Sequence, residues 1–131
     1  MANTQSMCTS FMSELMYGYH QFGAPTLTSR GSLTAPTNDT FKGALYVTTA
    51  TINAATTAYS ATNEVTGTNY SAGGVTVTNA TAPTFTNTSS TAGTAYWTPS
   101  ASLTYTNVTL TTAFDTVLIY NSTQGNRAVS V

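Results

Sequence analysis

The spacing of apolar residues at the start of the chain predicts an amphipathic helix over residues 6–22. The apolar residues that recur at intervals of three or four positions are Met7, Phe11, Leu15, Tyr19 and Phe22. This interval places them along one face of a helix. Gly23 followed by Pro25 is suited to end the helix. Gly18 is unfavourable inside it, because glycine costs a helix about 1 kcal/mol relative to alanine.

Residues 24–40 show little periodicity and contain Pro25, Gly31 and Pro36. They are expected to form an extended arm or a long loop. An unstructured run of this length is uncommon in a compact domain and often has a function. A fully extended arm of this length could span roughly 50 Å.

From Phe41 onward the apolar residues follow a period of two, which is typical of β-strands. Residues 41–48 alternate as expected of a half-buried strand. The nearly continuous apolar run at residues 116–120 is typical of a central strand that is covered on both faces. Further short strands are expected at residues 75–78, 95–98, 103–105, 108–110 and 128–131.

No helix-length pattern separates these strands, which argues against a parallel sheet. The predicted fold is mainly β: an antiparallel β-sandwich or jelly roll with one N-terminal α-helix and an extended arm. The helix and the arm occupy residues 1–40, and the sandwich occupies residues 41–131. The two parts are expected to form a single structural unit.

The composition excludes several classes of function. Three basic and four acidic residues make up 5% of the 131 residues, while threonine occupies 31 positions. Threonine favours extended backbone and solvates the outward face of a strand. Three isolated cations cannot form the basic surface that nucleic acids or anionic membranes require. No apolar run approaches the ~20 residues of a transmembrane helix, and no signal-peptide pattern is visible at the start.

Glu64 is the most isolated charge in the sequence. One interpretation is a ligand for a hard cation, together with Asn63 and loop carbonyls. The other is a carboxylate that pins a loop by accepting backbone N–H bonds, or that pairs with Arg127 or Lys42. One carboxylate is too few for a calcium site, so the structural interpretation is favoured and no metal is expected.

The remaining reactive residues do not form a catalytic pattern. Glu14 is expected on the polar side of the helix and Asp115 in a turn, so they do not suit the paired carboxylates of a glycosidase. Cys8 and His20 would lie ~18 Å apart along one helix, too far for a nucleophile and its base. Cys8 has no disulfide partner and suits a small buried position. We therefore expect no catalytic residues and no cofactor.

Two groups of apolar and aromatic residues suggest binding instead. The helix is apolar on more than one side, through Met7, Met12, Met16, Tyr17 and Tyr19. It therefore either packs between the sheet and the arm or docks on a partner subunit. Aromatic rings that could stack on sugars are Tyr59, Tyr70, Tyr96, Trp97 and Tyr105. The alternation around Trp97, however, places that ring on the apolar side of its strand, in the core.

Several segments resemble small structural proteins of tailed bacteriophages, above all short-tailed, T7-like and marine phages. The most specific segment is Ala61–Tyr70, with the sequence ATNEVTGTNY, followed by Ala72-Gly73-Gly74. The other segments are Met7–Phe11 (MCTSF), Glu14-Leu15 with Gly18, His20 and Phe22, Asp39–Lys42 (DTFK), Ala44–Tyr46 (ALY), Leu118–Ser122 (LIYNS) and Asn126–Val129 (NRAV).

The resemblance implies a virion component with a β-sandwich or jelly-roll core and no catalytic residue. Similar proteins continue beyond the segment that ends at Val129 with another strand or two, whereas this chain stops at Val131. A strand without a neighbour would leave an open sheet edge. The pairing is therefore expected either from a strand that is missing here or from a neighbouring subunit.

The function expected from these observations is that of a capsid decoration or cement protein. Its partners would be the major capsid protein or other virion subunits, in a homo-oligomeric arrangement, and it would be located in the virion. The expected contact residues are Phe11, Tyr17, Leu27, Arg30 and Leu33. The alternatives are a tail, fibre or head–tail adaptor subunit, and a receptor- or glycan-binding module.

Overall fold

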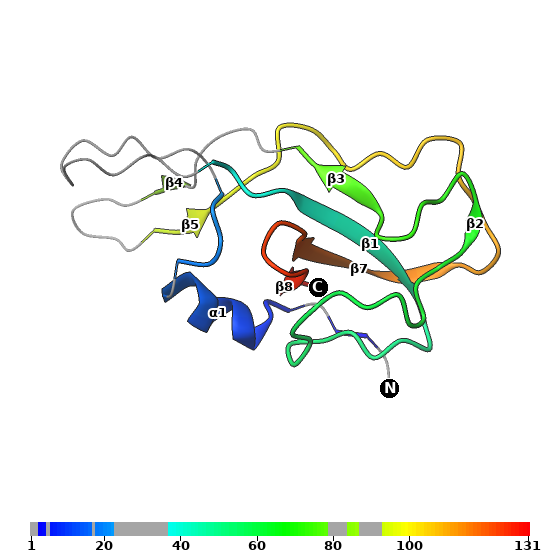
Figure 1. Ribbon diagram of the computed structural model, residues 1–131, viewed down its shortest axis with the longest axis horizontal. Coiled ribbons are helices and arrows are strands. Elements are labelled where there is room, and N and C mark those ends of the chain that lie inside the picture. The colour runs from blue at the N-terminus through cyan, green and yellow to red at the C-terminus, as the bar shows by residue number, and fades with distance from the viewer. Residues whose placement is uncertain (1–2, 5, 17, 23–36, 79–83, 87–92) are drawn as a thin grey trace.

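The described part of the chain is built around a four-stranded antiparallel sheet (Figure 1). The computed structural model describes residues 3–4, 6–16, 18–22, 37–78, 84–86 and 93–131. The strands of the sheet, in spatial order, are β3 (Val75–Val77), β1 (Phe41–Val47), β7 (Phe114–Asn121) and β8 (Arg127–Ser130). The helix of the described part is α1 (Thr9–Met16).

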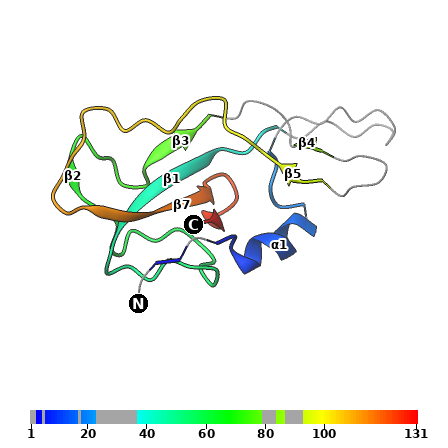
Figure 2. The same ribbon diagram turned by 180° about the vertical axis from the view of Figure 1, so that it is seen from behind.

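Two smaller antiparallel pairs flank the main sheet. One pairs β2 (Gly67–Thr68) with β6 (Thr109–Leu110), and the other pairs β4 (Thr84–Phe85) with β5 (Ala95–Tyr96). They lie at opposite ends of the molecule, and α1 lies beside β8 (Figures 1 and 2). The expected mainly β, antiparallel architecture with an N-terminal helix is confirmed. The arrangement is compatible with a sandwich or jelly roll.

Strand β1 lies between β3 and β7, and the prediction that it is half-buried is wrong. Ala44 and Tyr46 are buried, as are Phe41 and Leu45 on the alternate positions. On one side, the Tyr46 hydroxyl donates to the Ser60 carbonyl 2.6 Å away. Segments outside the strands therefore cover both faces of β1, which the alternation of its side chains does not reveal.

The helix is shorter than its apolar spacing predicts, because Gly18 ends it. Gly18 has a φ of +71°, in the left-handed region that glycine adopts without strain. Its N–H donates to the Leu15 carbonyl, and the Tyr19 N–H donates to the Glu14 carbonyl, the two bonds of a Schellman motif. Phe22 therefore reaches the core from non-helical chain, where its ring stacks on Phe41 at 4.5 Å.

Other sequence predictions of strands hold only in part. Strands at residues 75–77, 95–96, 109–110 and 127–130 match the expected positions closely. Residues 103–105 form no strand, although Leu103 packs against the backbone of Gly43. Strands β2 and β4, each two residues long, were not predicted. Strand β7 is central, as expected, but Val117 and Ile119 are only half-buried.

The chain itself covers the outer edge of β8. The N–H of Ser6 donates to the Val131 carbonyl, the N–H of Val131 donates to the Ser6 carbonyl, and the Cys8 N–H donates to the Val129 carbonyl. Further along, the Ala128 N–H donates to the Thr57 carbonyl. The expectation that a missing strand or a neighbouring subunit supplies this pairing is therefore wrong for this structure.

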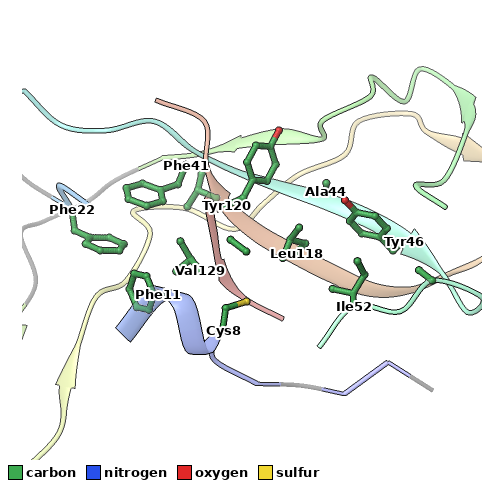
Figure 3. Packing of buried hydrophobic residues seen from close by; sticks show 13 residues of the cluster. Cys8, Phe11, Phe22, Phe41, Ala44, Tyr46, Ile52, Leu118, Tyr120 and Val129 are labelled. Carbon is green, nitrogen blue, oxygen red and sulfur yellow. The ribbon is translucent and has the colours of Figure 1, made fainter. Parts of the chain in front are cut away.

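The core lies between α1 and the main sheet (Figure 3). Its members include Cys8, Phe11, Phe22, Phe41, Ala44, Tyr46, Leu118, Tyr120 and Val129. Cys8 is fully buried, as expected for a small apolar residue. Burial and the nearby Glu14 carboxylate raise the pKa of the Cys8 thiol, which makes it a poor nucleophile.

Candidate functional site

Glu14 lies at the centre of a buried polar network between α1 and the sheet. It was expected on the polar side of the helix, but it is only 5% exposed. Its Oε2 lies 2.7 Å from Nε2 of His20, and its Oε1 accepts a 2.6 Å hydrogen bond from Nη1 of Arg127. A buried carboxylate requires such partners. The apolar spacing could not reveal them, because Arg127 lies 113 positions away in the sequence.

The network continues from His20 to the end of β7. Nδ1 of His20 lies 3.1 Å from Nδ2 of Asn121, which is fully buried. Nδ2 of Asn121 also donates to Oδ2 of Asp39 at 2.6 Å. Its Oδ1 accepts the N–H groups of Thr123 and Gln124. Each atom of this amide therefore has partners of the complementary kind.

Asp39 holds together the two ends of the segment that was predicted to be an arm. Its N–H donates to the Gln21 carbonyl at 3.0 Å, and its Oδ2 accepts the Gln21 N–H at 2.9 Å. Most of residues 24–40 lie outside the described residues. The two hydrogen bonds place Gln21 and Asp39, which flank this segment, side by side.

Glu64 anchors a second polar cluster. Its Oε2 accepts the Tyr59 hydroxyl at 2.6 Å, and its Oε1 accepts the Tyr70 hydroxyl and the Gly73 N–H, each at 2.7 Å. This geometry supports the interpretation of Glu64 as a loop pin. Within the described residues, Glu64 forms no ion pair with Arg127 or Lys42, and Arg127 instead pairs with Glu14.

Tyrosine hydroxyls extend this cluster to β1. The Tyr70 hydroxyl accepts the Leu45 N–H at 3.0 Å, and the Tyr105 hydroxyl donates to the Gly43 carbonyl at 2.6 Å. Burial raises the pKa of both Tyr46 and Tyr105 to about 12. Burial, together with the hydrogen bonds to Glu64, raises the pKa of Tyr59 and Tyr70 above its usual range. These phenols therefore act as neutral structural groups.

Gly73 and Gly74 let the chain pass close to β1. Gly74 has a φ of +71°, and a Cβ at this position would lie 1.7 Å from the Gly43 carbonyl oxygen. The turn predicted for this pair thus also brings its backbone close to that of Gly43. Its position allows Gly73 to reach Glu64 and to accept the Tyr120 hydroxyl at 2.9 Å.

The five aromatic residues considered for sugar binding do not form one platform. Tyr59 stacks on Tyr120, and Tyr70 stacks on Tyr105, with their hydroxyls used inside the protein. Tyr96 is 44% exposed. The half-buried ring of Trp97 packs against Phe22 and Phe41, as the alternation of its strand predicted.

The two residue pairs considered for catalysis, Glu14 with Asp115 and Cys8 with His20, do not contact each other; each member binds other groups. Asp115 is exposed on β7 and accepts a hydrogen bond from Asn3, whereas Glu14 binds His20 and Arg127. Both ring nitrogens of His20 contact groups other than Cys8. Across the described ranges, His, Cys, Asp and Glu side chains do not gather in threes that could hold a metal ion.

An apolar groove lies between α1 and β5. It has a volume of about 490 Å³ and includes Met7, Phe11, Leu15, Phe22, Tyr96 and Trp97 among its lining residues. We call it the N-terminal groove. Met7, Leu15 and Tyr96 are exposed at its rim, whereas Phe11 is only 6% exposed and packs on His20 and Phe22. The other expected contact residues, Tyr17, Leu27, Arg30 and Leu33, lie outside the described residues.

The polar clusters therefore stabilise the fold, and the N-terminal groove is the surface feature best suited to binding. Within the described residues, none of the helical structure is both long and apolar enough to span a membrane. No protein-family model, curated protein or solved structure matches the chain. The inference of function consequently depends on the residues and their geometry.

Proposed function

We propose that this chain is a virion structural protein of a tailed phage, and specifically a capsid decoration protein that binds the major capsid protein. The observation that carries this proposal is the use of charge. All four acidic residues, Glu14, Asp39, Glu64 and Asp115, accept hydrogen bonds from the chain's own groups. The chain would therefore recognise a partner through its shape and through apolar contacts, which suits a binding subunit and not an enzyme.

The N-terminal groove supplies an apolar surface for such contact. Met7 is 55% exposed and Leu15 is 45% exposed beside it. Methionine adapts to the shape of a partner, and tyrosine and tryptophan are enriched at interfaces. Phe22, the last described residue before the segment that contains the expected contacts Leu27, Arg30 and Leu33, also lines this groove.

The resemblance to tailed-phage structural proteins supports the same proposal. The residues of its most specific segment, 61–70, include Glu64 and Tyr70, which hold the loop against β1. Many copies on a symmetric head would give avidity, so each contact can be modest. The same surface could also bind a second copy of the chain, in agreement with the expected homo-oligomer.

The test is the binding of the purified protein to phage heads that lack it, measured as occupancy by cryo-EM. Leu15→Ser removes an apolar side chain at the rim of the N-terminal groove and should reduce occupancy. Phe114→Ser is the matched control, because Phe114 is 51% exposed but lines a different hollow with Leu45 and Val117. Equal occupancy for both variants would argue against the N-terminal groove as the contact surface.

Imaging of complete particles distinguishes the alternatives. Density for the chain on the head surface would support the decoration function. Density at the tail, the fibres or the head–tail junction would replace it with the tail or adaptor alternative. Absence of the chain from purified particles, with selective binding on a glycan array, would favour the receptor- or glycan-binding module.

A further inference from the structure

His20 is the only histidine of the chain and is buried at the junction of α1 with the sheet. Its Nε2 lies 2.7 Å from the Glu14 carboxylate, and its Nδ1 lies 3.1 Å from the Asn121 amide nitrogen. A carboxylate accepts and an amide nitrogen donates. The ring must therefore carry its proton on Nε2 and accept at Nδ1, which is the neutral form.

The Asn121 side chain cannot rotate to accommodate a second proton on His20. Its Oδ1 accepts the backbone N–H groups of Thr123 at 3.1 Å and Gln124 at 3.2 Å. Its Nδ2 donates to Asp39 at 2.6 Å. Reversing the amide would place its NH2 group against two donors and its oxygen against a carboxylate. A proton on Nδ1 would consequently face an N–H donor in a buried position.

The charges around His20 come from each element packed against it. Glu14 on α1 faces Nε2, and Arg127 on β8 already pairs with that carboxylate at 2.6 Å. Asp39, just before β1, contacts Asn121 on β7, whose amide in turn contacts His20. The rings of Phe11, Phe22 and Phe41 occupy the rest of the surroundings. None of these groups offers an acceptor to a proton on Nδ1.

We propose that His20 is an acid-sensitive latch, whose neutral ring joins the N-terminal unit, residues 6–22, to the sheet and whose protonation releases that unit. The link is stable while the ring is neutral and weakens when Nδ1 gains a proton, because that proton would face the N–H donor of Asn121. Release would break the bonds of Ser6 to Val131 and of Cys8 to Val129 and uncover that part of the outer edge of β8, while the bond of Ala128 to Thr57 remains. This inference is independent of the proposed capsid function.

The experiment combines two measurements on the intact chain. Nitrogen-15 NMR of the only imidazole gives its tautomer and charge directly at each pH. Hydrogen exchange gives the protection of the Cys8 and Val131 amides, which bond to Val129 and Ser6 across the junction. Between about pH 8 and about pH 5, protonation should coincide with a loss of protection of at least about tenfold at both amides. Amides between β1 and β7 should keep their protection.

Two variants separate the latch from general acid sensitivity. His20→Gln keeps an amide that can donate to Glu14 but cannot gain a proton, so its Cys8 amide should stay protected at about pH 5. Asp115→Asn, an exposed change on β7, should respond to acid as the original chain does. A protonated His20 with an unchanged Cys8 amide, or a proton on Nδ1 at neutral pH, would overturn the latch even if His20→Gln does not fold.

Discussion

The hydroxyl of Tyr70 lies between Glu64 and β1: it donates to the Glu64 carboxylate at 2.7 Å and accepts the Leu45 N–H at 3.0 Å. A side chain thus satisfies a backbone donor of the central strand. The pairing of β1 with β3 runs from Phe41 to Gly43 and therefore ends two positions before Leu45. Beyond Gly43, Tyr70 of the Glu64 cluster accepts the Leu45 N–H, a hydrogen bond that a neighbouring strand would otherwise supply.

The first prediction concerns the Glu64 carboxylate. Glu64→Gln leaves one oxygen where two accepted hydrogen bonds from Tyr59, Tyr70 and Gly73. The free energy of unfolding should fall by about 1–3 kcal/mol, because buried donors lose their acceptor. Urea denaturation measures this change. Asp115→Asn removes an exposed carboxylate that accepts a hydrogen bond from Asn3, and it should change stability by less than about 0.5 kcal/mol. Similar losses in both variants would contradict the role given to Glu64.

The second prediction concerns the two glycines with similar backbone angles. Gly74→Ala should cost more than about 3 kcal/mol, since its Cβ would overlap the Gly43 carbonyl oxygen. Gly125 has a φ of +66°, but a Cβ there meets no atom within 4 Å. Gly125→Ala should therefore cost only the left-handed conformation, about 1–2 kcal/mol. Thermal unfolding of the two variants compares them directly, and equal losses would show that contact with Gly43 is unimportant.

The third prediction concerns alkaline pH. Burial raises the pKa of Tyr46 and Tyr105 to about 12, above the usual value near 10. Their contribution to stability is complete below about pH 10 and is lost as the pH rises to about 12, because the unfolded chain ionises first. Tyrosinate absorbance should appear together with unfolding in this interval. Ionisation of all eight tyrosines near pH 10 in a folded chain would contradict this prediction.

The fourth prediction concerns residues 24–38. Since Gln21 and Asp39 are joined by two hydrogen bonds, a short Gly-Ser linker can replace these residues without moving β1. The variant should keep its unfolding temperature within a few degrees and should no longer occupy phage heads. A linker of the original length is the control for reach. Normal occupancy of purified particles by the shortened chain would rule out residues 24–38 as a contact with the phage head.

The sequence was informative where burial follows a simple period. The alternation at residues 41–48 and the apolar run at residues 116–120 predicted the two central strands. The helix was predicted too long, because Tyr19 and Phe22 continue the helical spacing after Gly18 has turned the chain. Backbone angles, and not the apolar pattern, set that boundary.

The polar clusters could be predicted only in part. The loop-pinning role of Glu64 follows from its isolation in an uncharged segment. The burial of Glu14 does not, because its partners His20 and Arg127 come together only in the folded chain. The hydroxyl contacts of the tyrosines were not predicted either, because their rings were considered for stacking on sugars. Their hydroxyls are used internally, in contacts that join positions as distant as Gly43 and Tyr105.

The reciprocal hydrogen bonds between Ser6 and Val131 have a topological consequence. A few added residues joining the first and last positions would close the chain into a ring while every strand stays in place. New ends opened at the exposed turn around Gly125 would make β8 the first element. The added residues and residues 1–5 would then connect β8 to residues 6–8. A pairing that now spans almost the whole polypeptide would become a neighbouring hairpin, with a much smaller loop-closure entropy during folding.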